Sequence, residues 1–277
     1  MDYSYTINGR ILALNDISLS FGENLVLKGV SGAVHNIVRP NMEQGQVVAL
    51  LGPSGIGKTQ LFRIMASLEI PGGTVTGSVT LGVNDIPIKP GLIGVVQQSY
   101  PLFRNRTVLG NLLVAGGTTE LSPTDVLEKA RGLLQEFELT NRADLYPSQL
   151  SGGQRQRLAI AQQLMCSEHL ILMDEPFSGL DPLMVDRVVG FIQKIAVMNE
   201  YNTTIVVTHD ISTALVVADR IWVLGRDRDD KGEIIPGAHI VDDYDLAEMG
   251  LAWRPDIRKD PLFRELSGTI RDRFKTL

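Results

Sequence analysis

The sequence predicts an α/β protein whose mostly parallel sheet is organised around a phosphate-binding loop. Along the middle of the chain, short apolar runs alternate with amphipathic segments of helical period, which is the pattern of parallel strands covered by helices. One apolar run, 47–51, turns through three glycines into a Lys-Thr pair. The octapeptide Gly52-Pro53-Ser54-Gly55-Ile56-Gly57-Lys58-Thr59 fits the pattern G-x-x-x-x-G-K-[ST].

The composition is that of an ordinary globular protein, with 277 residues of which 44% are hydrophobic and 21% charged. A net charge of −6 argues against a broad nucleic-acid-binding face, so we expect no nucleic acid partner. Cys166 is the single cysteine, which excludes a disulfide framework and a cysteine metal cluster. No apolar run approaches the ~18 residues of a membrane span, and Met1–Arg10 lacks a secretory signal pattern, so we expect a cytoplasmic location.

The first third of the chain predicts strands before the phosphate-binding loop. Ile11–Leu19 and Leu25–Leu27 are short and apolar-rich, and Phe21 lies between them. An aromatic side chain at this place either packs against its own sheet or stacks on a nucleotide base. Residues 29–46 have no clear period and are interrupted by glycine and proline, so we expect a loop with at most one short strand.

The loop itself indicates a triphosphate site. Its small residues allow backbone N–H groups to curl around phosphates, while Lys58 reaches the β and γ phosphates and Thr59 holds Mg²⁺. A helix is expected to follow, because apolar residues recur at helical spacing, and its N-terminus favours an anion. These apolar residues are Leu61, Ile64, Met65 and Leu68.

The central region predicts two further strands and then a helical insertion. Thr74–Leu81 alternates as a strand does, and Ile93–Val96 is a short buried strand that ends at Gln97-Gln98. From Tyr100 to Leu164 the pattern is helical. One helix begins after the N-cap Ser122, and a second runs from about Ser151 to Met165.

Two later apolar strands end in polar pairs. Leu170–Met173 ends in Asp174-Glu175, and Ile205–Val207 ends in Thr208-His209. An open parallel sheet places its ligand at such strand ends. Adjacent side chains of a strand point in opposite directions, so we assign Asp174 to Mg²⁺ through water, and Glu175 to orienting and deprotonating the attacking water.

The remaining elements are helices and a polar turn. A helix begins at Asp181-Pro182, the segment Arg226–Lys231 is expected to be a solvated charged turn, and Asp260-Pro261 opens a terminal helix. The apolar face of this terminal helix either docks on its own domain, which we favour, or contacts a second copy.

The string Leu150-Ser151-Gly152-Gly153-Gln154 predicts a second anion site. Ser151 caps the following helix, while Gly152 and Gly153 leave N–H groups of its first turn uncovered. One triphosphate does not need two such sites in one subunit. A two-fold dimer would use both sites, because the string Leu150–Gln154 of each copy, called the signature string below, then closes on the γ-phosphate bound by the partner's loop.

Taken together, these motifs resemble the ATP-binding cassette (ABC) ATPases over residues 10–225. The resemblance implies a nucleotide-binding domain at 1–230 that contains an antiparallel β portion and a helical subdomain at about 99–165. Residues 231–277 would then be a short C-terminal extension.

The resemblance also implies roles for single residues. Gln98 senses Mg²⁺ and water, His209 contacts the γ-phosphate, and Asp181 belongs to the D-loop, which acts across the dimer. Phe21 stacks on adenine. The expected cofactors are ATP and Mg²⁺, and the expected catalytic residues are Glu175, His209, Gln98 and Lys58. ATP is expected to contact Phe21 and the residues from Gly52 to Gln60, and to contact Leu150 to Gln154 of the partner copy. The metal ion is expected to contact Thr59, Gln98 and Asp174.

The chain departs from the family pattern at three places. The stretch around Ser31–Asn41 is longer than usual, Gln60 stands where Thr is frequent, and Gln162 stands where Arg is common. None of these changes removes a reacting group, and Glu175 is present, so both sites of a homodimer are expected to hydrolyse ATP.

A single cassette without a membrane segment implies a transporter ATPase whose channel is a separate permease, with a solute-binding protein as a further possible partner. The cluster Tyr100–Phe103 either docks on that permease or packs inside the helical subdomain. Arg254–Phe274 is loosely similar to ATPases of nitrate, sulfonate and taurine importers, so we expect solute import. The alternatives are a cassette for lipid or lipoprotein traffic or export, and a soluble ABC ATPase outside transport.

Overall fold

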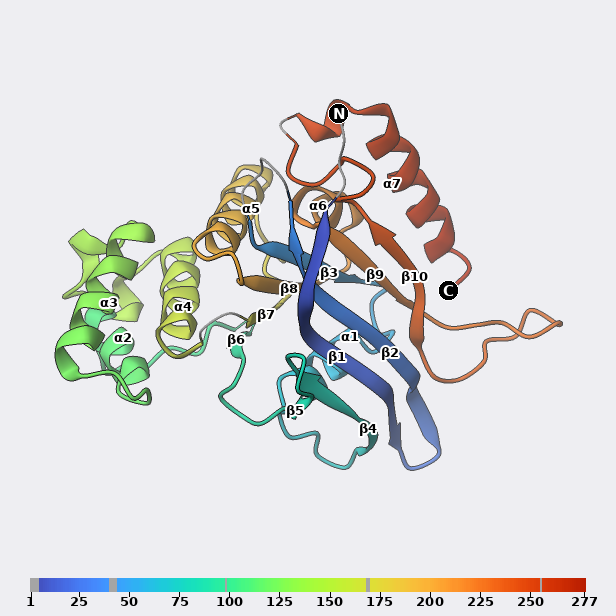
Figure 1. The fold of residues 1–277 in the computed structure, drawn as a ribbon, viewed down its shortest axis with the longest axis horizontal. Coiled ribbons are helices and arrows are strands. Elements are labelled where there is room, and N and C mark those ends of the chain that lie inside the picture. The colour runs from blue at the N-terminus through green and yellow to red at the C-terminus, as the bar shows by residue number, and fades with distance from the viewer. Residues whose placement is uncertain (1–4, 40–43, 98, 168–169, 255) are drawn as a thin grey trace.

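Two β-sheets and a separate group of helices make up the fold (Figure 1). The computed structural model describes residues 5–39, 44–97, 99–167, 170–254 and 256–277. The larger sheet lies at the centre, the smaller sheet packs beside it, and the helices α2, α3 and α4 gather on one side of the molecule (Figure 1).

The central sheet has six strands in the order β10-β9-β3-β8-β7-β6. Five of them run parallel and only β10 is antiparallel to its neighbour β9, which confirms the predicted mostly parallel α/β fold. Every residue of β3 and β8 is buried, as is typical of strands covered on both faces. The bounds are β3 Gln46–Leu51, β6 Gly94–Val96, β7 Leu170–Asp174, β8 Thr203–Thr208, β9 Arg220–Gly225 and β10 His239–Asp245.

Alternate residues of β3 face two different hydrophobic clusters. Val47, Ala49 and Leu51 belong to the cluster that includes helices α5, α6 and α7, because successive strand side chains point to opposite faces. Val48 and Leu50 belong to the cluster that includes α1 and the smaller sheet. The helices are α1 Lys58–Met65, α5 Pro182–Val197, α6 Ile211–Val217 and α7 Pro261–Phe274.

The terminal helix α7 docks on its own chain, as predicted. Its residues Phe263, Leu266 and Ile270 are buried in the α5–α6 cluster, and α7 packs against α6. Asp260 caps the helix by accepting a hydrogen bond from the backbone of Leu262 at 2.9 Å. A short 3₁₀ turn, Ile257–Lys259, precedes it.

The smaller sheet is antiparallel, with order β2-β1-β4-β5, and it corrects one prediction. The segment 29–46 was expected to be mostly loop, but β2 continues to Val38 and pairs with β1 along its length. Gly32 reads as a break, yet it lies inside the strand, where a Cβ would approach side-chain atoms of Ile240 and Trp222 to 3.1 and 3.3 Å. The bounds are β1 Thr6–Phe21, β2 Asn24–Val38, β4 Thr74–Leu81 and β5 Ile86–Pro87.

The helical group agrees with the prediction of a helical region after residue 100. Ser122 caps α3 and Ser151 caps α4 through their side-chain oxygens. The bounds are α2 Val108–Gly116, α3 Pro123–Glu136 and α4 Gly152–Cys166, with 3₁₀ turns at Thr140–Arg142 and Pro147–Gln149. Cys166 is partly buried at the end of α4.

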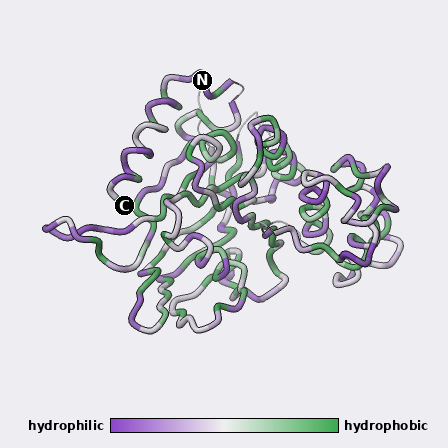
Figure 2. The backbone as a smooth tube through the Cα atoms, turned by 180° about the vertical axis from the view of Figure 1, so that it is seen from behind, coloured by the Kyte–Doolittle hydropathy of each residue, from purple (hydrophilic) through white to green (hydrophobic). Residues whose placement is uncertain are grey.

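Strands β9 and β10 and helix α6 were not specifically predicted from the sequence. Strand β10 is partly buried and polar, so its pattern does not stand out from a loop. Between β9 and β10, residues 226–238 form an arm whose tip is exposed. Figure 2 shows hydrophilic residues toward this tip, whereas hydrophobic residues follow the central strands. Among the described residues, no helix is long and apolar enough to cross a membrane.

Candidate functional site

The register of the parallel strands brings three of the predicted motifs together. Leu51 at the end of β3 pairs with Thr208 at the end of β8, and Asp174 at the end of β7 pairs with Val207. The phosphate-binding loop, the Asp174-Glu175 pair and His209 therefore lie along one edge of the sheet.

The phosphate-binding loop has the conformation that its glycines predict. Gly55 and Gly57 have φ values of +78° and +116°, a region that L side chains rarely adopt. Gly52 has no room for a side chain, because a Cβ would lie 2.7 Å from the carbonyl oxygen of Leu224. Ser54 and Gly55 are exposed, so backbone groups of the loop are open to a ligand.

Lys58 is the buried cation of this edge. Its ammonium donates hydrogen bonds to the carbonyl oxygens of Gly52 at 2.7 Å and Pro53 at 3.0 Å. Burial lowers the pKa of Lys58, while the carboxylates of Glu175 and Asp174 act to raise it. Lys58 is thus held inside the loop and within the electrostatic reach of both acids.

Asp174 carries an unsatisfied acceptor. Its Oδ1 atom is buried and has no hydrogen-bond partner, which is costly for a carboxylate. Burial raises the pKa of Asp174, the neighbouring Glu175 raises it further, and Lys58 lowers it. A cation beside this oxygen would supply the missing interaction, so the residue suits a divalent metal ion.

Glu175 has a left-handed backbone, with φ of +47°, a conformation that costs a non-glycine residue about 1–3 kcal/mol. Its N–H donates to the carbonyl oxygen of Val207 at 2.8 Å. The side chain lies against His209, whose Nδ1 is 2.9 and 3.0 Å from the two carboxylate oxygens, and Thr208 donates its hydroxyl hydrogen at 3.4 Å. The bend after β7 therefore gives Glu175 contacts of its own with His209 and Thr208. The separate roles predicted for the two acids stay predictions.

The signature string forms the capped helix start that was predicted. The Ser151 hydroxyl accepts a hydrogen bond from the Gln154 backbone at 3.3 Å, and the Gln154 side chain accepts one from the Ser151 backbone at 2.9 Å. Ser151 and Gly152 are exposed, whereas Leu150 is buried beneath them. The start of α4 thus presents its small residues to solvent.

Phe21 is the last residue of β1, and β2, which follows it, reaches the loop. Residues Val26 and Leu27 of β2 lie against Gly57, where a Cβ would approach their side chains to 3.2 and 3.0 Å. The Phe21 ring is partly buried in the cluster with α1, so it also serves as a packing residue.

Gln60 on α1, the last residue of the predicted ATP contact, has a buried, unpartnered Oε1 atom.

The other predicted residues lie outside this group or outside the described residues. Asp181 is exposed and caps α5 by accepting from the backbones of Leu183 and Met184 at 3.0 and 3.1 Å. Gln98 lies outside the described residues, so its assignment stays a prediction. In the cluster 100–103, Tyr100 and Leu102 pack on the hydrophobic core while Phe103 is 45% exposed.

Together, the fold and this edge define a P-loop ATPase subunit with a signature helix. Comparison with known proteins gives the family. The model of the ABC transporter family matches residues 36–178, which is more than half of the chain. The chain belongs to the ABC transporter family, and the predicted ATPase class is confirmed.

Several relatives are named as ATP-binding proteins of import or transport systems. The chain is 38% identical over 220 residues to the L-cystine import ATP-binding protein TcyC of Bacillus subtilis, covering 76% of this chain and 85% of that protein. It is 36% identical over 234 residues to the glutamine transport ATP-binding protein GlnQ of the same organism, covering 82% and 90%. The sulfate/thiosulfate import ATP-binding protein CysA of Mesostigma viride is 36% identical over 221 residues, but the chain spans only 60% of its length.

A solved structure agrees with the fold. The chain is similar to cbiO1 of Clostridium perfringens, part of the ABC transporter complex cbiONQ, with a TM-score of 0.70 over 95% of this chain and 100% of that one. At 22% identity this likeness supports the α/β fold alone.

Sequence reasoning missed two contacts of the site. Thr208 was noted only as the neighbour of His209, yet its hydroxyl bonds Glu175. Gln156, which follows the signature string, bonds the carbonyl oxygen of Pro176 at 3.0 Å. No local signal in the sequence points to Gln156, because its need for a partner follows from burial that appears only once α4 has packed.

Proposed function

We propose that the chain hydrolyses ATP as the energy-coupling subunit of a solute importer. The observation that carries this proposal is the register that brings the phosphate-binding loop, Glu175 and His209 to one sheet edge. Import is supported by the roles of the relatives, whose names describe import or amino acid transport. The assignment of residues 1–230 to the ATPase domain and of 231–277 to an extension stays part of the proposal.

In the proposed complex, the phosphate groups lie on the loop from Gly52 to Gln60. Backbone N–H groups and the start of α1 bind the anion, and Lys58 exchanges its loop carbonyl partners for phosphate oxygens. Phe21 contacts the adenine ring from the β1–β2 turn.

Thr59, Asp174 and Gln98 would hold Mg²⁺. The buried, unpartnered oxygen of Asp174 fits a metal-bound water or the ion itself. Bound there, the ion would neutralise phosphate charge during phosphoryl transfer. Its charge would also offset the desolvation that now raises the pKa of Asp174.

Glu175 acts as the general base and His209 as its partner. The contact with His209 Nδ1 fixes the carboxylate, and the half-exposed imidazole keeps its Nε2 atom for the γ-phosphate. Glu175 orients the attacking water and takes its proton. The left-handed backbone at Glu175 turns the chain directly after Asp174.

A second copy of the chain completes each site. Ser151 and Gly152 expose the start of α4, which is an anion site that the same chain's triphosphate does not require. In a head-to-tail dimer, Leu150–Gln154 of one copy would close on ATP bound by the other, and the exposed Asp181 would lie at the shared interface.

We infer that permease subunits hold this dimer at the cytoplasmic face of the membrane, and that a solute-binding protein supplies cargo. The exposed Phe103 and Pro101 are the part of the 100–103 cluster that is free to contact a permease, since Tyr100 and Leu102 are occupied in the core. Dimer closure on two ATP molecules would drive the permease, because ATP favours the closed state.

The Glu175→Gln variant tests the proposal. With ATP and Mg²⁺ it should elute as a dimer from a sizing column and hydrolyse ATP at no more than about 1% of the parent rate, because loss of a general base costs roughly 10²–10⁴-fold. Elution as a monomer in ATP, or hydrolysis at the parent rate, would contradict the dimer or the base assignment, respectively. Purification of the tagged parent in detergent should bring a membrane protein with it.

A further inference from the structure

The signature helix α4 makes a buried polar contact with the loop that carries the general base. Gln156, 2% exposed, donates from its Nε2 atom to the carbonyl oxygen of Pro176 at 3.0 Å. Pro176 directly follows Glu175. The contact therefore joins the helix that begins at Ser151 to the peptide next to the reacting carboxylate.

The loop after β7 depends on tertiary contacts for its shape. A left-handed φ of +47° at Glu175 persists only where surrounding bonds hold it. The Glu175 N–H bonds Val207 on the sheet side, and the Glu175 carbonyl accepts from Ser178 at 3.1 Å within the loop. Gln156 supplies a hydrogen bond from the helix side, so the loop is held between the sheet and α4.

Side chains of α5 lie against α4 on both sides of Gln156. The Met184 methyl group lies beside Gly153, where a Cβ would be 2.8 Å from it. The Arg157 guanidinium lies 5.2 Å from the centre of the Phe191 ring. These contacts flank Gln156 in the sequence, so a shift of the signature string moves the amide as well.

We propose that Gln156 is a positioning residue that sets the orientation of the Glu175 carboxylate from the signature helix of the same chain. Engagement of Ser151 with the partner's triphosphate would then be transmitted through Gln156 and Pro176 to the base that acts on this chain's own ATP. The inference rests on the proposed role of Glu175. Within one chain, it links Ser151, which contacts the ATP bound by the partner, to Glu175, which acts on the ATP bound by the chain itself.

Gln156→Met tests this role, because Met has a similar length but no donor. We expect kcat for ATP hydrolysis to fall about tenfold or more while KM for ATP changes less than about twofold, since the phosphate-binding loop is untouched. A kcat equal to that of the parent would overturn the proposal, and so would a rise in KM that accounts for the whole loss.

Asn202→Leu is the matched control. Asn202 is 7% exposed and donates from its side-chain amide to the carbonyl oxygen of Ile195 at 2.8 Å, immediately before β8 and at the far edge of the sheet. Its loss removes one buried hydrogen bond from a side-chain amide to a backbone carbonyl, as Gln156→Met does. We expect a similar fall in melting temperature with kcat within twofold of the parent. An equal fall in kcat in both variants would make the Gln156 effect a general loss of stability and overturn the proposal.

A double variant separates positioning from structure. In the Glu175→Gln background, Gln156→Met should leave the residual hydrolysis rate unchanged and preserve ATP-dependent dimer formation, because a residue that acts through Glu175 has nothing left to position. A further tenfold fall there would overturn the proposal. If Gln156→Met does not fold, Gln156→Asn keeps the amide one methylene short and the same kcat and KM criteria apply.

The outcomes also separate this inference from the proposed function. Parent-level hydrolysis by Glu175→Gln would overturn the assignment of the base, and the positioning role with it. Loss of hydrolysis in Glu175→Gln with a parent-level kcat in Gln156→Met would overturn the positioning role alone.

Discussion

The two ends of the parallel strands treat polar groups in opposite ways. At the carboxyl end, Lys58 is buried against loop carbonyls, Asp174 has an unpartnered buried oxygen, and Glu175 has a left-handed backbone. At the amino end, buried Arg39 pairs with buried Asp219. One end keeps polar groups that a ligand would satisfy, and the other pairs its charges within the chain.

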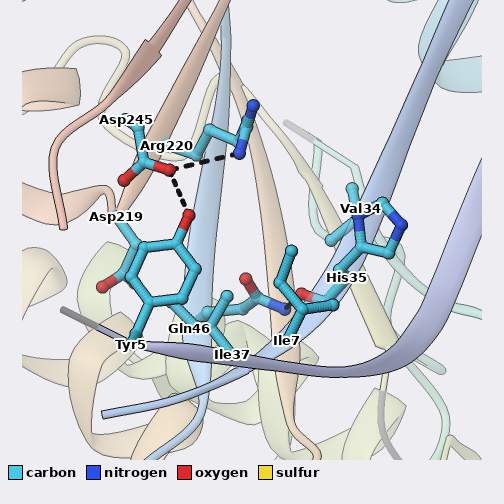
Figure 3. Close-up of a pocket in the computed structure, with 9 residues that line it drawn as sticks. All are labelled: Tyr5, Ile7, Val34, His35, Ile37, Gln46, Asp219, Arg220 and Asp245. Atoms are coloured by element: carbon cyan, nitrogen blue, oxygen red, sulfur yellow. Dashed lines mark hydrogen bonds and ion pairs between the residues drawn. The ribbon is translucent and has the colours of Figure 1, made fainter. Parts of the chain in front are cut away.

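The amino end joins segments that are distant in the chain. Asp219 accepts from the Val47 backbone at 2.7 Å and from Arg39, whose guanidinium lies 4.3 Å from the Trp253 ring centre. Figure 3 shows Tyr5 pointing to Asp245, which also pairs with Arg220 at 3.3 Å. The carboxyl end, which is the proposed binding edge, thus leaves polar groups for a ligand, while the opposite edge ties the long hairpin and the C-terminal segment to the sheet.

The largest effect is expected at the binding edge. Lys58→Ala should lower ATP hydrolysis by roughly 10³-fold, because a preorganised cation at the transferred phosphate is lost. The free energy of unfolding should change by less than about 1 kcal/mol, since the variant also removes a desolvated charge. Steady-state hydrolysis and urea unfolding measure the two quantities. A large loss of stability would show that Lys58 stabilises the fold, as the charges at the amino end do.

Next in size is Arg39→Met at the opposite edge. It should lower the free energy of unfolding by about 3 kcal/mol, because Asp219 is left buried without its cation. The affinity of the folded protein for ATP should stay within about twofold of the parent. Urea unfolding and nucleotide titration measure the two quantities. A loss of ATP affinity without a loss of stability would show that Arg39 serves ATP binding rather than stability.

The same variant has a defined pH dependence. Burial raises the pKa of Asp219 to about 7, with Arg39 acting to lower it. A raised carboxyl pKa gives stability that is present at low pH and is lost as pH rises through the folded pKa. Without Arg39 that pKa is higher still, so the stability gap between parent and variant should be constant below about pH 7 and widen above it. A gap that narrows above pH 7 would contradict this.

Tyr5→Phe should have a smaller effect, a loss of about 1 kcal/mol from one hydrogen bond to a carboxylate. Burial and the bond to Asp245 raise the pKa of Tyr5 to about 12. The parent should therefore lose stability as pH rises from about 10 to 12, where the hydroxyl ionises in the unfolded chain first, and the variant should lack this part of the loss. Unfolding by urea at pH 9 and pH 11 compares them.

The smallest effect is expected away from both edges. Arg258 pairs with Asp186 at 2.9 Å, and both side chains are about half exposed. Arg258→Ala should change the free energy of unfolding by no more than about 0.5 kcal/mol and leave hydrolysis unchanged. A change in the free energy of unfolding as large as that of Arg39→Met would show that the burial of an ion pair does not determine its contribution to stability.

The sequence predicts the binding edge better than the opposite one, for a physical reason. Gly52–Thr59 and Leu150–Gln154 are local strings whose geometry follows from neighbouring residues. Gly32 lies inside β2 because the side chains of Trp222 and Ile240 pack against it. These residues are distant in the chain, so the extension of β2 was missed. The partner of Gln156 lies 20 residues away and becomes visible only when α4 packs beside the loop.

The strand register has a further consequence for how the chain tolerates change. The spacing between the phosphate-binding loop, Glu175 and His209 is set by the ladders that pair Leu51 with Thr208 and Asp174 with Val207. One residue inserted in β8 would advance His209 by about 3.3 Å and turn it to the other face. Length variation is therefore excluded from these central strands, whereas the exposed tip of the arm, 227–234, can lengthen or shorten without moving a reacting group.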